Sequence, residues 1–448
     1  MERKEMNNKE KLKRTTFETS RELEYFTEKE IEMQIGYGKE WWPIALIKEL
    51  IDNSLDACET TNIPPQIEVD IETGWFSVRD NGPGLPAKLI KKSLNYMKRV
   101  SDKTFYVSPS RGQMGNALKV VWAAPYIENG EKGEIEVWTK GKYHKITVTL
   151  DRIKQEPVIE HLSEESDFIK KGTLFKIYGF DSNVILKPES EDFYKVPPQI
   201  SKVIEAYSAF NPHARFILKI HDNKDKIYEP TNLEWNKWKP NNPTSAHWYE
   251  LETLRDLIAA YVTEEREGSR AKTVREFVSE FRGLSGISKQ KLIVPDEMKN
   301  IYLHDLIKDG DIDMKKLEKL HNDMKDNSKM PQPIVLGYLG KEHISEWMMN
   351  YAGCTKDSIK YNRRVGFDDT DGMPYVIEIG FGIREKDEVG RRYLTGLNWT
   401  ATLGTPTEVI SEVIGEMRID KEDPVTLLIH MAKPRFEYVD RGKTRLEL

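Results

Sequence analysis

The chain has 448 residues, of which 38% are hydrophobic and 10% aromatic, which is enough apolar material for packed cores and excludes a disordered or collagen-like chain. At about 150 residues per domain, this length predicts two or three domains. The 68 basic and 74 acidic residues give a formal charge of −6, so any contact with nucleic acid would need local basic patches rather than bulk attraction.

The sequence contains no pattern typical of secretion or of a membrane span. Its two cysteines, Cys58 and Cys354, are too few for a disulfide framework or a cysteine-based metal site. No apolar run approaches the roughly 20 residues that a span requires. Residues 1–14 are charged throughout, without the apolar core of a signal peptide. We therefore expect a soluble, cytoplasmic protein with no membrane partner.

Patterning predicts an α+β protein with a short arm and three modules. Residues 1–20 are polar and basic-leaning and predict a mobile arm. The first module mixes helix and strand patterns, and the second turns helical after a Pro/Asn-rich opening. The third begins with a charged helix over 311–327 and a proline-flanked linker. The modules span residues 21–225, 226–305 and 306–448; strands are expected at 66–71, 75–78, 134–139, 146–150, 375–381 and 425–431, and an apolar helix near 408–417.

The strongest local signal is KELIDNSLDACE, residues 48–59. Its apolar residues recur at helical spacing and predict a buried stripe that includes Cys58. Glu49, Asn53 and Asp56 stand at i, i+4 and i+7 and share another face of the helix. A carboxylate one turn from a carboxamide suits a magnesium site, where the amide oxygen binds the ion and the carboxylate deprotonates a water. A solvated polar face would give the same spacing.

A second segment, VRDNGPGLP, brings a strand to its end at Asp80 and then turns through Gly82 and Gly84. A buried carboxylate at a strand end can accept a hydrogen bond from the exocyclic amine of adenine. Glycines at the turn would let the backbone approach the base closely. An ordinary hairpin turn would show the same residues.

Two further segments carry paired small residues at element boundaries. In SRGQMGNALKVVWAAPY, residues 110–126, Gly112 and Gly115 open an apolar helix, an arrangement that aims backbone N–H groups at a phosphate. In KGTLFKI, residues 171–177, Gly172 and Thr173 stand at the start of a strand. Each pair alone is a common feature of loops and turns.

In this order and spacing, the four segments resemble the N-box, adenine box, glycine lid and Gly-Thr strand of the GHKL ATPase superfamily, whose Bergerat fold is an α/β sandwich. The resemblance implies that ATP and Mg²⁺ are the cofactors, with Glu49 as general base, Asn53 as the magnesium ligand and Asp80 as the adenine reader. It also implies that ATP is bound by Gly84, Lys103, Gly112, Gln113, Met114, Gly115, Asn116 and Thr173. The lid departs from many relatives by ending in Asn116-Ala117 rather than glycine.

Within the superfamily, the chain is most similar to the B subunit of type IIB DNA topoisomerases. Residues 242–258 and 273–291 resemble that subunit's helix-two-turns-helix insert, although residues 281–286 alone could be a simple turn between helices. Residues 373–383, 397–406 and 423–448 resemble its α/β transducer domain and lysine loop. The resemblance makes Lys443 a catalytic residue that reaches the γ-phosphate. A solvated basic tail is the alternative.

The resemblance implies an ATP-driven clamp that closes as a homodimer and gates DNA for a cleaving A-type subunit with a Toprim domain and a catalytic tyrosine. The family's transducer continues into a stalk helix, whereas this sequence stops at Leu448, so we expect another chain to supply the stalk or the coupling to differ. Two alternatives stay open. One is a MORC-like or MutL-like DNA clamp in repair or phage defence without strand passage, and the other is an ATP-sensing adaptor with little turnover.

Four basic segments are candidates for DNA contact, and each could equally be a solvated face. They are Lys9–Arg14, Lys140–Lys145, Arg391–Arg392 and Lys433–Arg445. Binding through phosphates would make the affinity fall steeply with salt.

Overall fold

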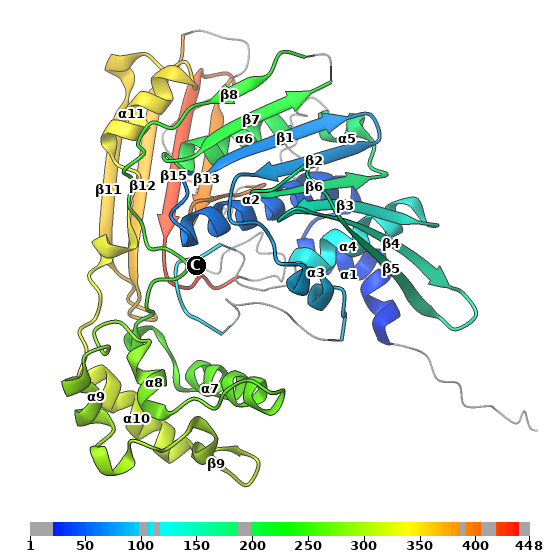
Figure 1. The fold of residues 1–448 in the computed structure, drawn as a ribbon. Helices are drawn as coiled ribbons and strands as arrows, with labels where there is room; N and C mark the ends of the chain where they lie inside the picture. Colours follow the sequence, from blue (N-terminus) through cyan, green and yellow to red (C-terminus); the bar gives the residue numbers. More distant parts are fainter. Residues whose placement is uncertain are drawn as a thin grey trace, which may run out of the picture.

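The computed structural model describes residues 21–97, 105–111, 117–186, 199–221, 223–385, 390–404 and 418–438. Over these residues the chain forms an eight-stranded sheet, a five-stranded sheet and a separate group of short helices (Figure 1). The expected α+β class is confirmed. Among the described helices, none is long and apolar enough to cross a membrane. The arm predicted over residues 1–20 lies outside the described residues.

The eight-stranded sheet has the order β5-β4-β3-β6-β2-β1-β7-β8, and its neighbouring strands are antiparallel except for the parallel pair β1 and β7. Alternate residues of β3 are buried, as expected of a sheet that is covered on one face. All four strands predicted in this part of the chain are present. The bounds are β1 Gln66–Glu72, β2 Trp75–Asp80, β3 Gly133–Thr139, β4 Lys142–Asp151, β5 Glu156–Glu165, β6 Thr173–Tyr178, β7 Arg215–Ile220 and β8 Lys226–Tyr228.

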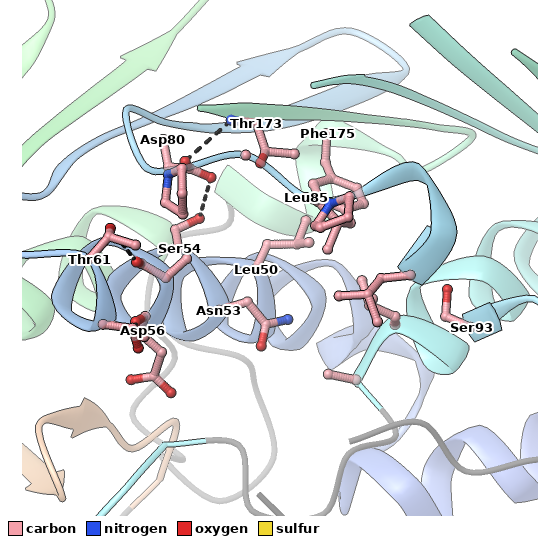
Figure 2. Close-up of a pocket in the computed structure, with 18 of the residues that line it drawn as sticks. Leu50, Asn53, Ser54, Asp56, Thr61, Asp80, Leu85, Ser93, Thr173 and Phe175 are labelled. Carbon is pink, nitrogen blue, oxygen red and sulfur yellow. Dashed lines mark hydrogen bonds between the residues drawn. The ribbon is translucent and has the colours of Figure 1, made fainter. Parts of the chain in front are cut away.

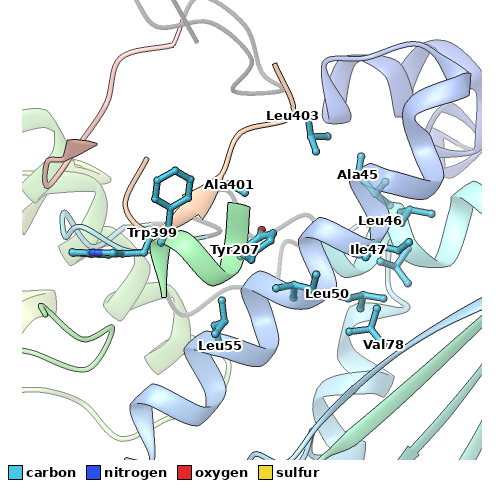
Figure 3. Packing of buried hydrophobic residues seen from close by; sticks show 14 of the residues in the cluster. Ala45, Leu46, Ile47, Leu50, Leu55, Val78, Tyr207, Trp399, Ala401 and Leu403 are labelled. Atoms are coloured by element: carbon cyan, nitrogen blue, oxygen red, sulfur yellow. The ribbon is translucent and has the colours of Figure 1, made fainter. Parts of the chain in front are cut away.

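Helices cover one face of this sheet, and α2 is the central one. Its apolar stripe is buried as predicted, and Cys58 lies in the core. Figure 3 shows α2 residues packed beside Tyr207 of α6 and, from much later in the chain, Trp399 and Ala401. The bounds are η1 Arg21–Phe26, α1 Glu28–Ile35, η2 Lys39–Trp41, α2 Trp42–Thr60, α3 Ala87–Ser93, α4 Ala117–Asn129, α5 Ser182–Leu186 and α6 Ile200–Phe210.

The helical group includes α10, which the division of the sequence assigned to the third module. This helix packs against α7 and η3, and His321 on it lies 2.9 Å from the carbonyl oxygen of Ala246. Residues 281–286 lie between α8 and α9. The bounds are η3 Ala246–Trp248, α7 Leu251–Arg266, α8 Val274–Ser279, α9 Ile287–Ile293, η4 Asp296–Met298, η5 Leu303–Leu306, β9 Ile307–Lys308, β10 Asp311–Ile312 and α10 Met314–Asp326.

The five-stranded sheet has the order β11-β12-β15-β13-β14, with β13 and β15 parallel and the other pairs antiparallel. The two strands predicted here are present, whereas the helix predicted near 408–417 lies outside the described residues. The bounds are η6 Pro333–Leu336, α11 Lys341–Asn350, η7 Lys356–Ser358, β11 Lys360–Phe367, β12 Pro374–Ile383, β13 Arg392–Leu397, β14 Thr400–Ala401 and β15 Val425–Ala432.

Candidate functional site

A cavity of about 380 Å³ lies between α2, the loop after β2, the start of α4 and β6 (Figure 2). These elements carry the four sequence segments that resemble the N-box, adenine box, glycine lid and Gly-Thr strand. The cavity thus brings together segments that are up to about 120 positions apart in the chain. Its lining includes Leu50, Asn53, Ser54, Asp56, Asp80, Gly84, Leu85, Leu89, Lys119, Thr173 and Phe175.

Asp80 provides a buried carboxylate in this cavity. Its Oδ1 accepts hydrogen bonds from the backbone N–H groups of Gly82 and Thr173, at 2.8 and 3.2 Å, and its Oδ2 accepts one from the Ser54 hydroxyl at 3.3 Å. Burial raises the pKa of Asp80 to about 6, although these hydrogen bonds oppose the rise. The carboxylate is therefore ionised at neutral pH and held in one orientation, ready to accept from a ligand's N–H group.

Two glycines near Asp80 stand where a side chain would not fit. Gly172 has a φ of +82°, and a Cβ there would lie 1.9 Å from the carbonyl oxygen of Asp80. Gly84 has a φ of +81°, and a Cβ there would lie 2.8 Å from a side-chain atom of Lys140. Both positions therefore exclude a side chain on steric and conformational grounds. The role predicted for Gly84, in shaping the base pocket, stays a prediction.

Much of the cavity lining is apolar. Leu50, Leu85, Leu89 and Phe175 line it from α2, the loop after β2, α3 and β6. An apolar cavity with one fixed carboxylate suits a flat heterocycle that carries a hydrogen-bond donor on its edge. Thr173 helps to fix the carboxylate of Asp80, because its backbone N–H donates to it.

The three residues predicted to share one polar face of α2 separate in the structure. Asn53 and Asp56 line the cavity, whereas Glu49 does not reach its lining. The Glu49 side chain is 32% exposed, and its Oε1 lies 3.3 Å from the ammonium group of Lys48. The same ammonium lies 3.1 Å from Oδ2 of Asp52, a carboxylate with 2% exposure. Glu49 is thus paired with Lys48, its neighbour in the chain.

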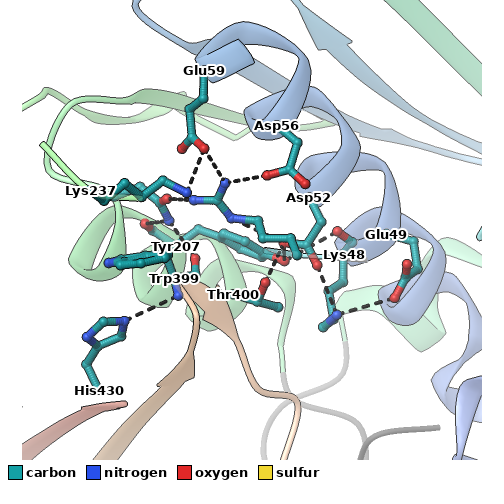
Figure 4. Close-up of polar contacts among 12 residues, drawn as sticks. Lys48, Glu49, Asp52, Asp56, Glu59, Tyr207, Lys237, Trp399, Thr400 and His430 are labelled. Atoms are coloured by element: carbon teal, nitrogen blue, oxygen red, sulfur yellow. Dashed lines mark hydrogen bonds and ion pairs between the residues drawn. The ribbon is translucent and has the colours of Figure 1, made fainter. Parts of the chain in front are cut away.

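A buried ionic cluster behind α2 was missed by the sequence analysis (Figure 4). The fully buried guanidinium of Arg111 donates to Asp56 and Glu59, at 2.8 Å each, and to the side-chain oxygen of Asn211 at 2.5 Å. Lys237 lies 2.7 Å from Glu59, and burial lowers the pKa of this lysine to about 8. The spacing of Asp52, Asp56 and Glu59, at i, i+4 and i+7, was the signal that could have found the cluster.

Arg111 is the second residue of the segment over 110–126 that resembles the glycine lid, directly before Gly112. Its ion pairs therefore fix the start of that segment to α2. Seven predicted site residues lie outside the described residues: Lys103, Gly112, Gln113, Met114, Gly115, Asn116 and Lys443. Their roles stay predictions.

A metal ion would find few protein ligands here. Within the described ranges, no group of three or more His, Cys, Asp and Glu side chains could hold a metal. Asn53, the predicted ligand, does line the cavity and offers an amide oxygen. That donor fits Mg²⁺, which commonly keeps several waters and takes one or two protein ligands together with the phosphates of a substrate.

Comparison with known proteins agrees with this geometry. Residues 38–154 match the family model described as histidine kinase-, DNA gyrase B-, and HSP90-like ATPase. The B subunit of type 2 DNA topoisomerase 6 from Archaeoglobus fulgidus is 25% identical over 246 residues, covering 53% of this chain and 37% of the relative. The protein of the same name from Sulfurisphaera tokodaii is 21% identical over 430 residues, covering 89% of this chain and 74% of the relative.

A third protein of this name, from Natronomonas pharaonis, is 27% identical over 231 residues, which cover 48% of this chain and 26% of the relative. The chain thus matches well under half the length of two of these relatives. Among solved structures, the B subunit of DNA gyrase from Myxococcus xanthus aligns with 94% of this chain and 88% of the gyrase chain. The sequence identity is 9% and the TM-score is 0.39, so the likeness is distant. The chain carries a GHKL-type ATPase domain, and its predicted resemblance to the B subunits of type IIB topoisomerases is confirmed.

Proposed function

We propose that this chain is the ATP-binding and ATP-hydrolysing subunit of a type IIB topoisomerase-like complex. The observation that carries the proposal is the buried carboxylate of Asp80, fixed by three donors in a largely apolar cavity. Asp80 lies in the segment over 38–154 that matches the ATPase family model. In this role Asp80 accepts from the exocyclic amine of adenine. The apolar cavity holds the ring, and Gly84 lets the loop after β2 approach it.

The phosphates of ATP would point along α2 toward Asn53, which would hold Mg²⁺ through its amide oxygen. The ion would supply charge neutralisation for the phosphates when bound. Glu49 would act as general base and accept a proton from the attacking water. The lid residues and Lys443 would contact the phosphates, as the family resemblance implies, with Lys443 stabilising charge on the transferred phosphoryl group.

The names of the relatives suggest DNA and an A-type subunit as partners. The family resemblance further implies that this subunit carries a Toprim domain and a catalytic tyrosine, and that a second copy of this chain binds when ATP is bound. The described parts of the candidate DNA patches are largely engaged in ion pairs. Lys142 lies 2.9 Å from Glu165, Lys145 lies 2.7 Å from Glu134, and Lys433 lies 2.6 Å from Asp368. DNA affinity through these segments would therefore need those pairs to open, and it should fall steeply as salt increases.

Affinity purification from the native host, with a non-hydrolysable ATP analogue and magnesium present, tests this assignment. Recovery of a chain with a Toprim domain and a catalytic tyrosine is the expected result. Recovery of this chain alone, or with a nuclease or helicase, would contradict the topoisomerase-like complex while leaving the ATP site to be judged by nucleotide binding.

A further inference from the structure

Asp52 of α2 joins the ATPase domain to the five-stranded sheet. Its Oδ1 accepts a hydrogen bond from the Tyr207 hydroxyl at 2.8 Å and another from the Thr400 hydroxyl at 3.0 Å. Tyr207 belongs to α6, beside α2, whereas Thr400 is the first residue of β14. Of the two hydroxyl donors to Oδ1 of this carboxylate, which is 2% exposed, one therefore comes from the other module (Figure 4).

The second oxygen of Asp52 is linked to Glu49 through the ammonium group of Lys48. Oδ2 lies 3.1 Å from the Lys48 ammonium, which lies 3.3 Å from Oε1 of Glu49. Burial alone would lower the pKa of Lys48, but the two carboxylates outweigh it and raise that pKa above its usual value. The lysine therefore stays charged, and its position depends on both Asp52 and Glu49.

The backbone of Thr400 is part of the five-stranded sheet, where Thr400 pairs with Leu397 of β13. It follows a tight turn in which Asn398 and Trp399 both adopt positive φ, at +48° and +63°. The backbone N–H of Trp399 donates to His430 of β15 at 3.3 Å, which holds the turn to the sheet. The carbonyl of Trp399 accepts from Asn211, the residue that follows α6, at 3.0 Å, so the turn contacts both parts. A displacement of this sheet relative to α2 would therefore move the Thr400 hydroxyl away from Asp52.

We infer that Thr400, Asp52 and Lys48 are positioning residues for Glu49. They make the orientation of its carboxylate, and hence the rate of ATP hydrolysis, depend on how the five-stranded sheet sits against α2. The inference rests on the proposed function, in which Glu49 is the general base. In this inference, the side chains of Thr400, Asp52 and Lys48 connect the five-stranded sheet to the carboxylate of Glu49.

The test compares valine and serine at position 400 in the full-length chain. Thr400→Val keeps the side-chain shape and removes the hydroxyl, whereas Thr400→Ser restores it. The matched control is Thr402→Val, because the Thr402 hydroxyl bonds to the Thr395 carbonyl oxygen at 3.2 Å inside the same sheet. For each variant, kcat for ATP hydrolysis and Kd for a non-hydrolysable ATP analogue are measured with magnesium present.

We expect Thr400→Val to lower kcat about tenfold, a modest share of the ~100-fold that a 1 Å misplacement can cost. The Kd should stay within about twofold of wild type, and Thr400→Ser and Thr402→Val should keep wild-type kcat. Equal kcat in Thr400→Val and Thr402→Val would overturn the inference, and so would a loss confined to nucleotide affinity. Glu49→Gln is measured alongside: if it keeps wild-type turnover, the proposed role of Glu49 fails, and the inference fails with it. If Glu49→Gln loses turnover but Thr400→Val keeps wild-type kcat, the inference about Thr400 fails and the proposed role of Glu49 stands.

Discussion

Replacing Asp80 by asparagine perturbs the cavity with almost no change of volume. The carboxylate uses Oδ1 for two backbone N–H donors and Oδ2 for the Ser54 hydroxyl. An amide can keep its oxygen on the two backbone donors, and the serine hydroxyl can turn to accept from the new NH₂ group. The fold around the loop is therefore preserved in Asp80→Asn, but the cavity edge then presents a donor where the carboxylate presented an acceptor.

This exchange should cost nucleotide affinity. Loss of a hydrogen bond to a charged acceptor is worth about 1.5–3 kcal/mol, and each 1.4 kcal/mol is about tenfold in Kd. We therefore expect Asp80→Asn to raise the Kd for ATP by about 10- to 150-fold, measured by titration calorimetry. Ser54→Ala, which removes one donor and keeps the carboxylate, should raise it by far less. An Asp80→Asn Kd within twofold of wild type would refute the assignment of Asp80 as adenine reader.

The same carboxylate predicts a pH dependence. Burial raises the pKa of Asp80 to about 6, so in the unliganded protein it takes up a proton as the pH falls through 6. Because ATP binding requires the ionised form, affinity should be full above pH 7 and about tenfold weaker at pH 5. Protons also bind ATP itself, so the measured quantity is the difference between wild type and Asp80→Asn. Parallel pH profiles for the two would contradict the reasoning.

Three further predictions concern stability and assembly. Arg111→Met leaves the carboxylates of Asp56 and Glu59 without their main partner. It should lower the free energy of unfolding, measured in denaturant titrations, by about 3–5 kcal/mol. The control Lys142→Met removes an exposed ion pair and should change that free energy by less than about 0.5 kcal/mol. Gly172→Ala places a Cβ 1.9 Å from a backbone oxygen and should abolish nucleotide binding, while Gly74→Ala, with similar φ and no atom within 4 Å, should lose only about 1–2 kcal/mol of stability. Light scattering should show a monomer without nucleotide and a dimer with a non-hydrolysable ATP analogue; a monomer in both conditions would disprove closure.

The sequence was a good guide wherever local pattern and tertiary structure agree. The alternation in residues 66–71 and 134–139 predicted strands, because one face of that sheet packs on helices and the other does not. Asp80 was singled out because a strand ends there and a glycine turn follows. The structure adds the later Gly-Thr pair, since the backbone N–H of Thr173 donates to the Asp80 carboxylate. The helix over residues 48–59 was found from its apolar stripe.

Long-range ion pairs could not be predicted in the same way. Asp52 and Glu59 stand in a run that reads as a solvated helix flank, and their partners Arg111, Lys237 and Thr400 come from three distant segments. Spacing shows which acids share a helix face, but it does not show what covers that face. The ion pair between Glu49 and Lys48, its neighbour in the chain, was not predicted either.

Steady-state ATP hydrolysis by the full-length chain, with magnesium, measured for wild type and Glu49→Gln beside their ATP affinities, tests the central claim most directly. A general base contributes about 10²–10⁴-fold, so Glu49→Gln should lose at least ~100-fold in turnover while its Kd for ATP stays within about twofold. Equal turnover in the two proteins, or ATP binding by wild type without measurable hydrolysis, would contradict the account, the second by making the chain a nucleotide-sensing adaptor.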